Sequence, residues 1–172
     1  MLNVNQYALH IIRPALDAIG LYSKAAEELL LGTAIQESRL EHLVQLGNGL
    51  ALSLFQMEPA THDSIWVDFL PDRPELALKV KRLAIPLQAG SKFEGQIYDI
   101  ILNRTEVPVR TLLWNRLYAV AMARVRYYWV PDALPAAGDI SRQAEYWKKF
   151  YNTPLGKGTE QEYLENWHKV MS

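Results

Sequence analysis

Hydrophobic residues recur at helical spacing along nearly the whole chain, and no segment alternates convincingly between apolar and polar positions. The pattern therefore predicts an all-α protein of about seven to eight helices. The expected helices cover residues 5–19 (with a kink at Pro14), 23–38, 59–71, 72–85, 93–102, 109–130, 141–151 and 159–172.

Helix-start signals set several of these boundaries. Ser23 and Ser141 are suitable N-caps, and Asp72 precedes a proline-containing first turn in a pattern that resembles a capping box. Thr159 and Glu162 have the spacing of a full capping box. We therefore expect these four residues or pairs to begin helices.

The segment 109–130 is the longest apolar stretch and predicts a central, mostly buried helix. Four arginines interrupt it: Arg110, Arg116, Arg124 and Arg126. Because charged side chains are costly inside a bilayer, these arginines exclude a membrane span.

Composition narrows the class of protein further. The 172 residues fit one domain, 1–172, and a net charge of −1 provides no general attraction for nucleic acid. The chain has no cysteine, and its four histidines are not at zinc-binding spacing, so we expect no metal and no cofactor.

Glu37 interrupts one of the apolar stripes. It continues a row of apolar or small positions on the helix that starts at Ser23: Ala26, Leu29, Leu30, Thr33 and Ala34. A carboxyl group in such a place is partly desolvated, which raises its pKa and makes it suitable as a general acid near neutral pH. The alternative is a structural glutamate that reaches water or pairs with Lys24 or Arg39.

The residues that follow Glu37 resemble a known family. Glu37-Ser38 is followed by a glycine-containing loop at 47–49, then by Leu54-Phe55-Gln56 and Pro59-Ala60-Thr61. This order and spacing resembles the lytic transglycosylase and goose-type lysozyme branch of the lysozyme-like superfamily. In that family a Glu-Ser pair ends a buried helix, and a Gly-Leu-Met-Gln-x-x-Pro-x-Thr-like segment lines the groove that holds the glycan.

The chain departs from the family pattern in two places. Ser53 stands where the family usually has glycine, and its Cβ would crowd a backbone that needs positive φ or close ligand approach. The family's later Ala-Tyr-Asn-x-Gly motif, whose tyrosine helps to orient the glutamate, has no clean counterpart. Tyr118 and Tyr127 fall at a plausible distance along the chain, with core packing as the alternative for both, and Tyr151-Asn152 matches the letters but lies late.

The resemblance implies a lysozyme-like fold with a glycan-binding groove and an enzyme that cleaves peptidoglycan between N-acetylmuramic acid and N-acetylglucosamine. Glu37 would be the catalytic acid. The implied substrate-binding residues are Ser38, Gln56, Glu58, Thr61, Tyr118 and Tyr127. No second carboxylate is evident, although Glu58 or Asp63 can supply one, so a lytic transglycosylase with one glutamate as acid and base is favoured over two-carboxylate hydrolysis.

Two other interpretations are open from the sequence. One is a catalytically degenerate lysozyme-like protein that serves as a virion structural or cell-wall-binding component, and the other is an unrelated helical interaction protein. The N-terminus lacks a basic region followed by an apolar run, so we expect no signal peptide. The resemblance suggests a bacteriophage protein, virion-associated or made in the host cytoplasm, that acts on the wall in the periplasm. Its expected partners are peptidoglycan strands and other virion proteins.

Overall fold

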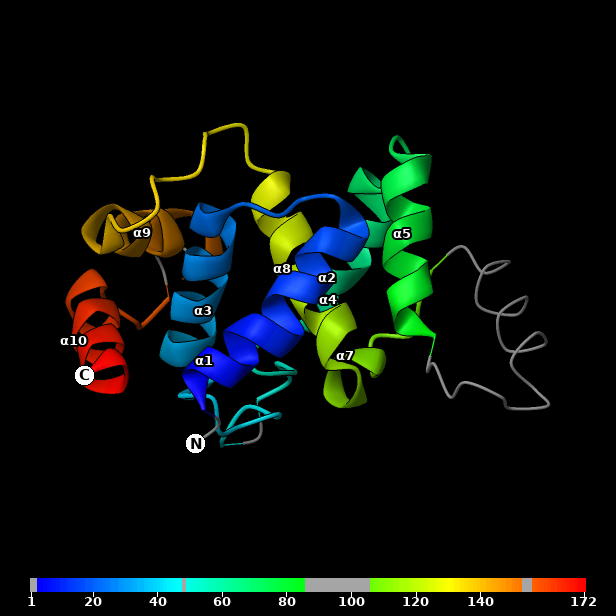
Figure 1. The fold of residues 1–172 in the computed structure, drawn as a ribbon. Coiled ribbons are helices and arrows are strands. Elements are labelled where there is room, and N and C mark those ends of the chain that lie inside the picture. Colours follow the sequence, from blue (N-terminus) through cyan, green and yellow to red (C-terminus); the bar gives the residue numbers. More distant parts are fainter. Residues whose placement is uncertain (1–2, 48, 86–105, 153–155) are drawn as a thin grey trace.

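The computed structural model describes residues 3–47, 49–85, 106–152 and 156–172, and within these ranges the protein is all-helical (Figure 1). This confirms the predicted class, while the helix expected over 93–102 lies outside the described residues. The α-helices are α1 Val4–Tyr7, α2 Arg13–Ile19, α3 Lys24–Ser38, α4 Pro59–Ser64, α5 Pro74–Ala84, α7 Thr111–Trp114, α8 Arg116–Tyr128, α9 Ile140–Trp147 and α10 Glu160–Met171. In the described ranges, no helix is long and apolar enough to cross a bilayer.

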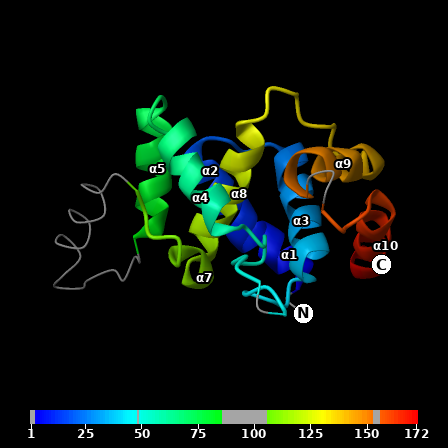
Figure 2. The same ribbon diagram turned by 180° about the vertical axis from the view of Figure 1, so that it is seen from behind.

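The central buried helix is α8. Its residues from Tyr118 to Ala123 are almost completely inaccessible to solvent. Helices α2 and α5 pack on α8. Helix α3 contacts α8 and also packs against α9 and α10. Figures 1 and 2 show the result: α5 lies toward one end of the molecule, α9 and α10 lie at the other, and α3 stands between α8 and that second pair.

Helix α3 begins as the sequence predicts and is anchored at both ends. The Ser23 hydroxyl accepts the Ala26 N–H at 3.0 Å as an N-cap. At the other end Arg39 takes a left-handed conformation (φ 51°), and its N–H donates to the Ile35 carbonyl at 2.9 Å. Since the helix stops at Ser38, Glu37 lies in its last turn.

Close packing of α3 against α10 depends on Gly32. The Tyr163 side chain of α10 lies so near that a Cβ at Gly32 would overlap the phenol hydroxyl. A glycine in the middle of a helix costs about 1 kcal/mol relative to alanine. Here the absence of a side chain at Gly32 allows α10 to pack directly against α3, the helix that carries Glu37.

The prediction of a single helix over 109–130 is wrong, because the helix is interrupted at Asn115. That residue is extended (φ −112°, ψ 98°), which separates α7 from α8. Its Oδ1 accepts the Tyr118 N–H at 3.0 Å, and its Nδ2 donates to the Leu83 carbonyl at 2.6 Å. The asparagine therefore caps α8 and ties it to the end of α5.

Two other predicted helix starts need correction, and one is confirmed. Asp139, not Ser141, is the N-cap of α9, and α5 follows Arg73 without a side-chain cap, so Asp72 does not form the expected capping box. The box at Thr159 is present. At α9, Asp139 and Ser141 have similar capping ability and stand two residues apart, so sequence alone does not fix which of them caps.

Three π-helical turns in the described ranges continue the α-helices: η1 Ala8–Ile12, η2 Ile65–Phe69 and η3 Lys148–Asn152. The first precedes Pro14, where a kink was predicted, and a proline has no N–H to complete a regular α-helical ladder. The third continues α9. Because a π-turn pairs residues five apart, η3 brings residues after Trp147 back to the same side of the helix.

Candidate functional site

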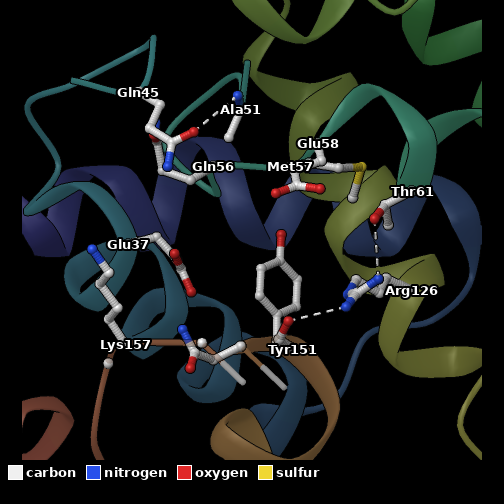
Figure 3. Close-up of a pocket in the computed structure, with 13 residues that line it drawn as sticks. Glu37, Gln45, Ala51, Gln56, Met57, Glu58, Thr61, Arg126, Tyr151 and Lys157 are labelled. Atoms are coloured by element: carbon white, nitrogen blue, oxygen red, sulfur yellow. Dashed lines mark hydrogen bonds between the residues drawn. The ribbon is translucent and has the colours of Figure 1, made fainter. Parts of the chain in front are cut away.

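A cavity of about 540 Å³ opens at the C-terminal end of α3 (Figure 3). Its polar lining comes from six separate parts of the chain: Glu37 of α3, Gln45, Gln56 and Glu58 of the following loop, Thr61 of α4, Arg126 of α8, Tyr151 and Asn152 of η3, and Lys157 before α10. Helices that are far apart in sequence therefore meet around one carboxyl group.

Burial dominates the electrostatics of Glu37. Desolvation raises the pKa of its carboxyl from 4.5 to about 7, although the Trp147 N–H and the positive charge of Arg126 both favour the carboxylate. Glu37 also sits in the last turn of α3, where the helix dipole disfavours a negative charge. At neutral pH the group is therefore present in both its acid and its base form.

The structural alternative for Glu37, an ion pair on the surface, is not what the geometry shows. Lys24 pairs with the buried Glu27 at 2.8 Å instead. Glu37 makes no ion pair within 4.0 Å with any residue in the described ranges. The carboxyl group faces the cavity and accepts a hydrogen bond from Trp147.

Trp147 of α9 is the direct partner of Glu37. Its indole Nε1 donates to Glu37 Oε1 at 2.8 Å, across 110 residues of sequence. Trp147 is 1% exposed, and its ring packs at a tilt of 36° against Tyr163 with the ring centres 5.5 Å apart. It also lies so close to Gly158 that a Cβ there would come within 2.7 Å of it. The indole is thus a fixed donor that holds the carboxyl in one orientation.

The loop after α3 is tied together by backbone hydrogen bonds. Leu52 and Met57 exchange two bonds of 2.9 Å, and the Ser53 N–H donates to the Leu43 carbonyl at 2.8 Å. The Gln56 amide closes the loop by donating to the carbonyls of Ser53 (2.7 Å) and His42 (3.2 Å) while its side chain also lines the cavity. Gln56 therefore supports the loop as well as the site.

Ser53 has the backbone conformation that favours glycine, with φ +69°. The serine hydroxyl compensates in part, since it accepts the Phe55 N–H at 3.2 Å. Ser53 is buried and is not among the residues that line the cavity. Its side chain therefore strains the loop without filling the cavity.

Four predicted site residues, Glu37, Gln56, Glu58 and Thr61, meet around the cavity. Ser38 does not line it. Its hydroxyl is buried and donates back to the Ala34 carbonyl at 3.0 Å, as a serine at a helix C-terminus often does.

Tyr118 and Tyr127 also lie outside the cavity lining, because both face the core. The Tyr118 hydroxyl is bonded to His62 Nε2 at 2.8 Å and to Trp66 Nε1 at 2.9 Å. The Tyr127 hydroxyl lies 2.8 Å from the hydroxyl of Thr33. With their hydroxyls engaged in the core, neither tyrosine is placed to contact a ligand in this cavity.

The late Tyr151-Asn152 pair lines the cavity in their place. Tyr151 donates its hydroxyl to the Phe55 carbonyl at 2.9 Å, which joins η3 to the loop after α3. The match to the letters of the family's Tyr-Asn motif was the available signal in the sequence. Its late position along the chain argued against it, since sequence distance does not reveal that η3 folds back onto α3.

The site offers acid and base chemistry together with hydrogen bonding. Glu37 is the one cavity-lining group whose pKa lies near neutrality by burial, and Arg126 and Lys157 add positive charge. In the part of the chain that the structure describes, no three His, Asp or Glu side chains are grouped to hold a metal ion. The arrangement suits a reaction in which one carboxyl group gives and then takes a proton.

Substituting Ser53 tests the strain in the loop. Ser53→Gly removes a Cβ from a left-handed residue, whereas Ser53→Ala keeps the Cβ and loses the hydroxyl bond to Phe55. We expect the glycine variant to exceed the alanine variant in free energy of unfolding by about 1 kcal/mol. Chemical denaturation measures the difference, and equal stability of the two variants would contradict the strain.

Removing the indole N–H isolates its effect on the acid. In Trp147→Phe the Glu37 carboxylate loses the indole N–H that donates to it, so the pKa of Glu37 rises above its wild-type value. The pH dependence of the Glu37 side-chain carboxyl ¹³C shift reports it directly. Trp129→Phe, at an indole that is 41% exposed and outside the cavity, is the control, and an unchanged titration in Trp147→Phe would refute the assigned contact.

Glu37 also makes stability depend on pH. Because the folded pKa of about 7 lies above the unfolded value of 4.5, its contribution is fully present below about pH 4.5 and is lost as pH rises to about 7. Glu37→Gln abolishes this loss, so its advantage in unfolding free energy grows over that window to roughly 3 kcal/mol. Denaturation at pH 4.5 and pH 8 measures it against Glu41→Gln, an exposed site; a constant difference would show that Glu37 has an ordinary pKa.

Comparison with known proteins assigns this chain to no family. No protein-family model, no curated protein and no solved structure matches this chain. What the protein does is therefore inferred from the residues around Glu37 themselves.

Proposed function

We propose that the protein is a peptidoglycan-cleaving enzyme, and that it acts as a lytic transglycosylase with Glu37 as its single acid and base. The observation that carries this proposal is a desolvated carboxyl group, with a pKa of about 7, on the wall of a cavity of about 540 Å³. A general acid is most effective when its pKa is near the working pH, because both protonation states are then populated.

The proposed reaction has two proton transfers. Protonated Glu37 gives its proton to the glycosidic oxygen, and the bond from C1 of the muramic sugar to that oxygen breaks. The Glu37 carboxylate then removes the proton of the C6 hydroxyl of the same sugar while O6 forms a bond to C1. The products are a 1,6-anhydromuramic end and a free 4-hydroxyl, and Glu37 ends protonated without consuming water.

The contacts of Glu37 support both halves of this cycle. Burial favours the acid form that begins the reaction, while the Trp147 N–H stabilises the carboxylate that completes it. Glu58 also lines the cavity and is exposed, so it is the candidate for a second carboxylate if the enzyme hydrolyses its substrate instead. The cell wall as the place of action, and a bacteriophage setting, come from the resemblance around Glu37-Ser38.

Cleavage of purified peptidoglycan tests the proposal. Glu37→Gln keeps the shape of the side chain but cannot donate its proton, so we expect clearing to fall by about 10² to 10⁴. Glu41→Gln, which removes an exposed carboxylate beyond the end of α3, is the matched control. Equal clearing by wild type and Glu37→Gln would refute the catalytic role.

The products identify the reaction. Mass spectrometry should find muramic ends that are lighter by one water than reducing ends. Reducing ends, together with loss of activity in Glu58→Gln, would instead indicate hydrolysis by two carboxylates. Wild-type protein that sediments with cell walls but cleaves none of them would indicate a binding protein.

A further inference from the structure

The cavity holds a positive charge, that of Arg126, which makes no ion pair with a carboxylate of the described residues. Arg126 of α8 lies on the side of the cavity opposite Glu37 and Lys157, next to Thr61, with Tyr151 between the two sides (Figure 3). No carboxylate in the described ranges lies within 4.0 Å of its guanidinium, and its buried Nε has no hydrogen-bond partner there. A half-buried cation without a counter-ion is costly, which favours an anion supplied by a ligand.

The guanidinium is held in place by neutral groups. Its Nη2 donates to the Tyr151 carbonyl at 3.0 Å, its Nη1 reaches the Thr61 hydroxyl at 3.5 Å, and its carbon stands 5.0 Å from the centre of the Tyr151 ring. These contacts orient the group without neutralising it. An arginine fixed in this way loses little entropy when it binds a ligand, and its planar fork matches a carboxylate.

Arg126 and Glu37 face the same cavity, so one ligand can meet both. A carboxylate at Arg126 would fix the position of a sugar chain relative to the carboxyl group of Glu37. A neutral polymer of N-acetylglucosamine can accept hydrogen bonds from the guanidinium but has no negative charge to pair with it. An acidic glycan supplies that charge, through either the lactyl group of its muramic sugar or its attached peptide.

We propose that Arg126, together with Thr61, forms a carboxylate subsite that selects acidic glycans over neutral ones. This inference rests on the proposed function, because it names the substrate class of the same cavity. Thr61 adds a neutral hydroxyl beside the guanidinium, which suits an oxygen ligand.

Binding measured in the Glu37→Gln background tests the subsite without turnover and without titration of Glu37. Three probes separate the sources of the carboxylate: muropeptides with their peptide stems, the same glycans stripped of stems so that the lactyl carboxylate is free, and neutral N-acetylglucosamine oligomers. We expect Arg126→Gln to weaken binding of at least one acidic probe by about tenfold or more and to leave the neutral oligomers unchanged. The acidic probe that responds identifies the source.

Two further variants separate recognition from folding. Arg126→Lys keeps the charge but lacks the planar fork, so its affinity for the acidic probe should fall between those of wild type and Arg126→Gln, at an unchanged melting temperature. Arg110→Gln, at an exposed arginine outside the cavity, is the control. Equal weakening for acidic and neutral probes would show a structural role for Arg126, and no weakening would show that the subsite does not exist.

Combining binding with cleavage distinguishes the two proposals. Cleavage without any Arg126-dependent preference overturns the subsite alone. An Arg126-dependent preference without cleavage overturns the reaction and keeps the subsite. Absence of binding to all three probes overturns both.

Discussion

Desolvation of a single carboxyl group is the constraint on which the rest of this structure depends. Glu37 lies in the last turn of a buried helix, where water is scarce and the helix dipole is unfavourable to a negative charge. The hydrogen bond from the indole N–H of Trp147 offsets part of the cost of desolvating the Glu37 carboxylate. These opposing effects hold the pKa of Glu37 at about 7, so both protonation states are populated at neutral pH. The surrounding helices keep the carboxyl group buried and its donor in place.

The supporting contacts converge from distant parts of the chain. Tyr163 packs over Gly32 and against Trp147, so α10 braces both the helix that carries the acid and the helix that carries its donor. Tyr151 joins the loop after α3 through the Phe55 carbonyl. A disturbance in α10 is therefore expected to reach Glu37 through packing, although no residue of that helix lines the cavity.

Much of the fold follows from local sequence signals, but the contacts of the site do not. The Ser23 cap, the buried stripe and the position of Glu37 were predictable because they depend on neighbours within one helix. The break at Asn115 was not, because the bond from its Nδ2 to the Leu83 carbonyl joins residues that are distant in the sequence.

The same reason explains the misplaced site residues. Tyr118 and Tyr127 stand at suitable distances along the chain, but α8 is buried on opposite faces, and each of these faces points one of the two tyrosines into the core. Trp147 meets Glu37 across 110 residues, which no pattern in a single sequence reveals. Local periodicity predicts which residues are buried, whereas it does not predict which of them meet.

The π-turn at η3 makes one wall of the cavity depend on the number of residues in that turn. A π-turn amounts to one extra residue accommodated within a helix, and the turn η3 holds Tyr151 and Asn152 at the cavity directly after Trp147, which bonds Glu37. Losing one residue there would restore regular α-helical winding and turn the following side chains by about 100° around the axis. The side chains that form this wall are thus sensitive to the number of residues in η3 as well as to their identity, so an insertion or deletion there would change which side chains face the acid.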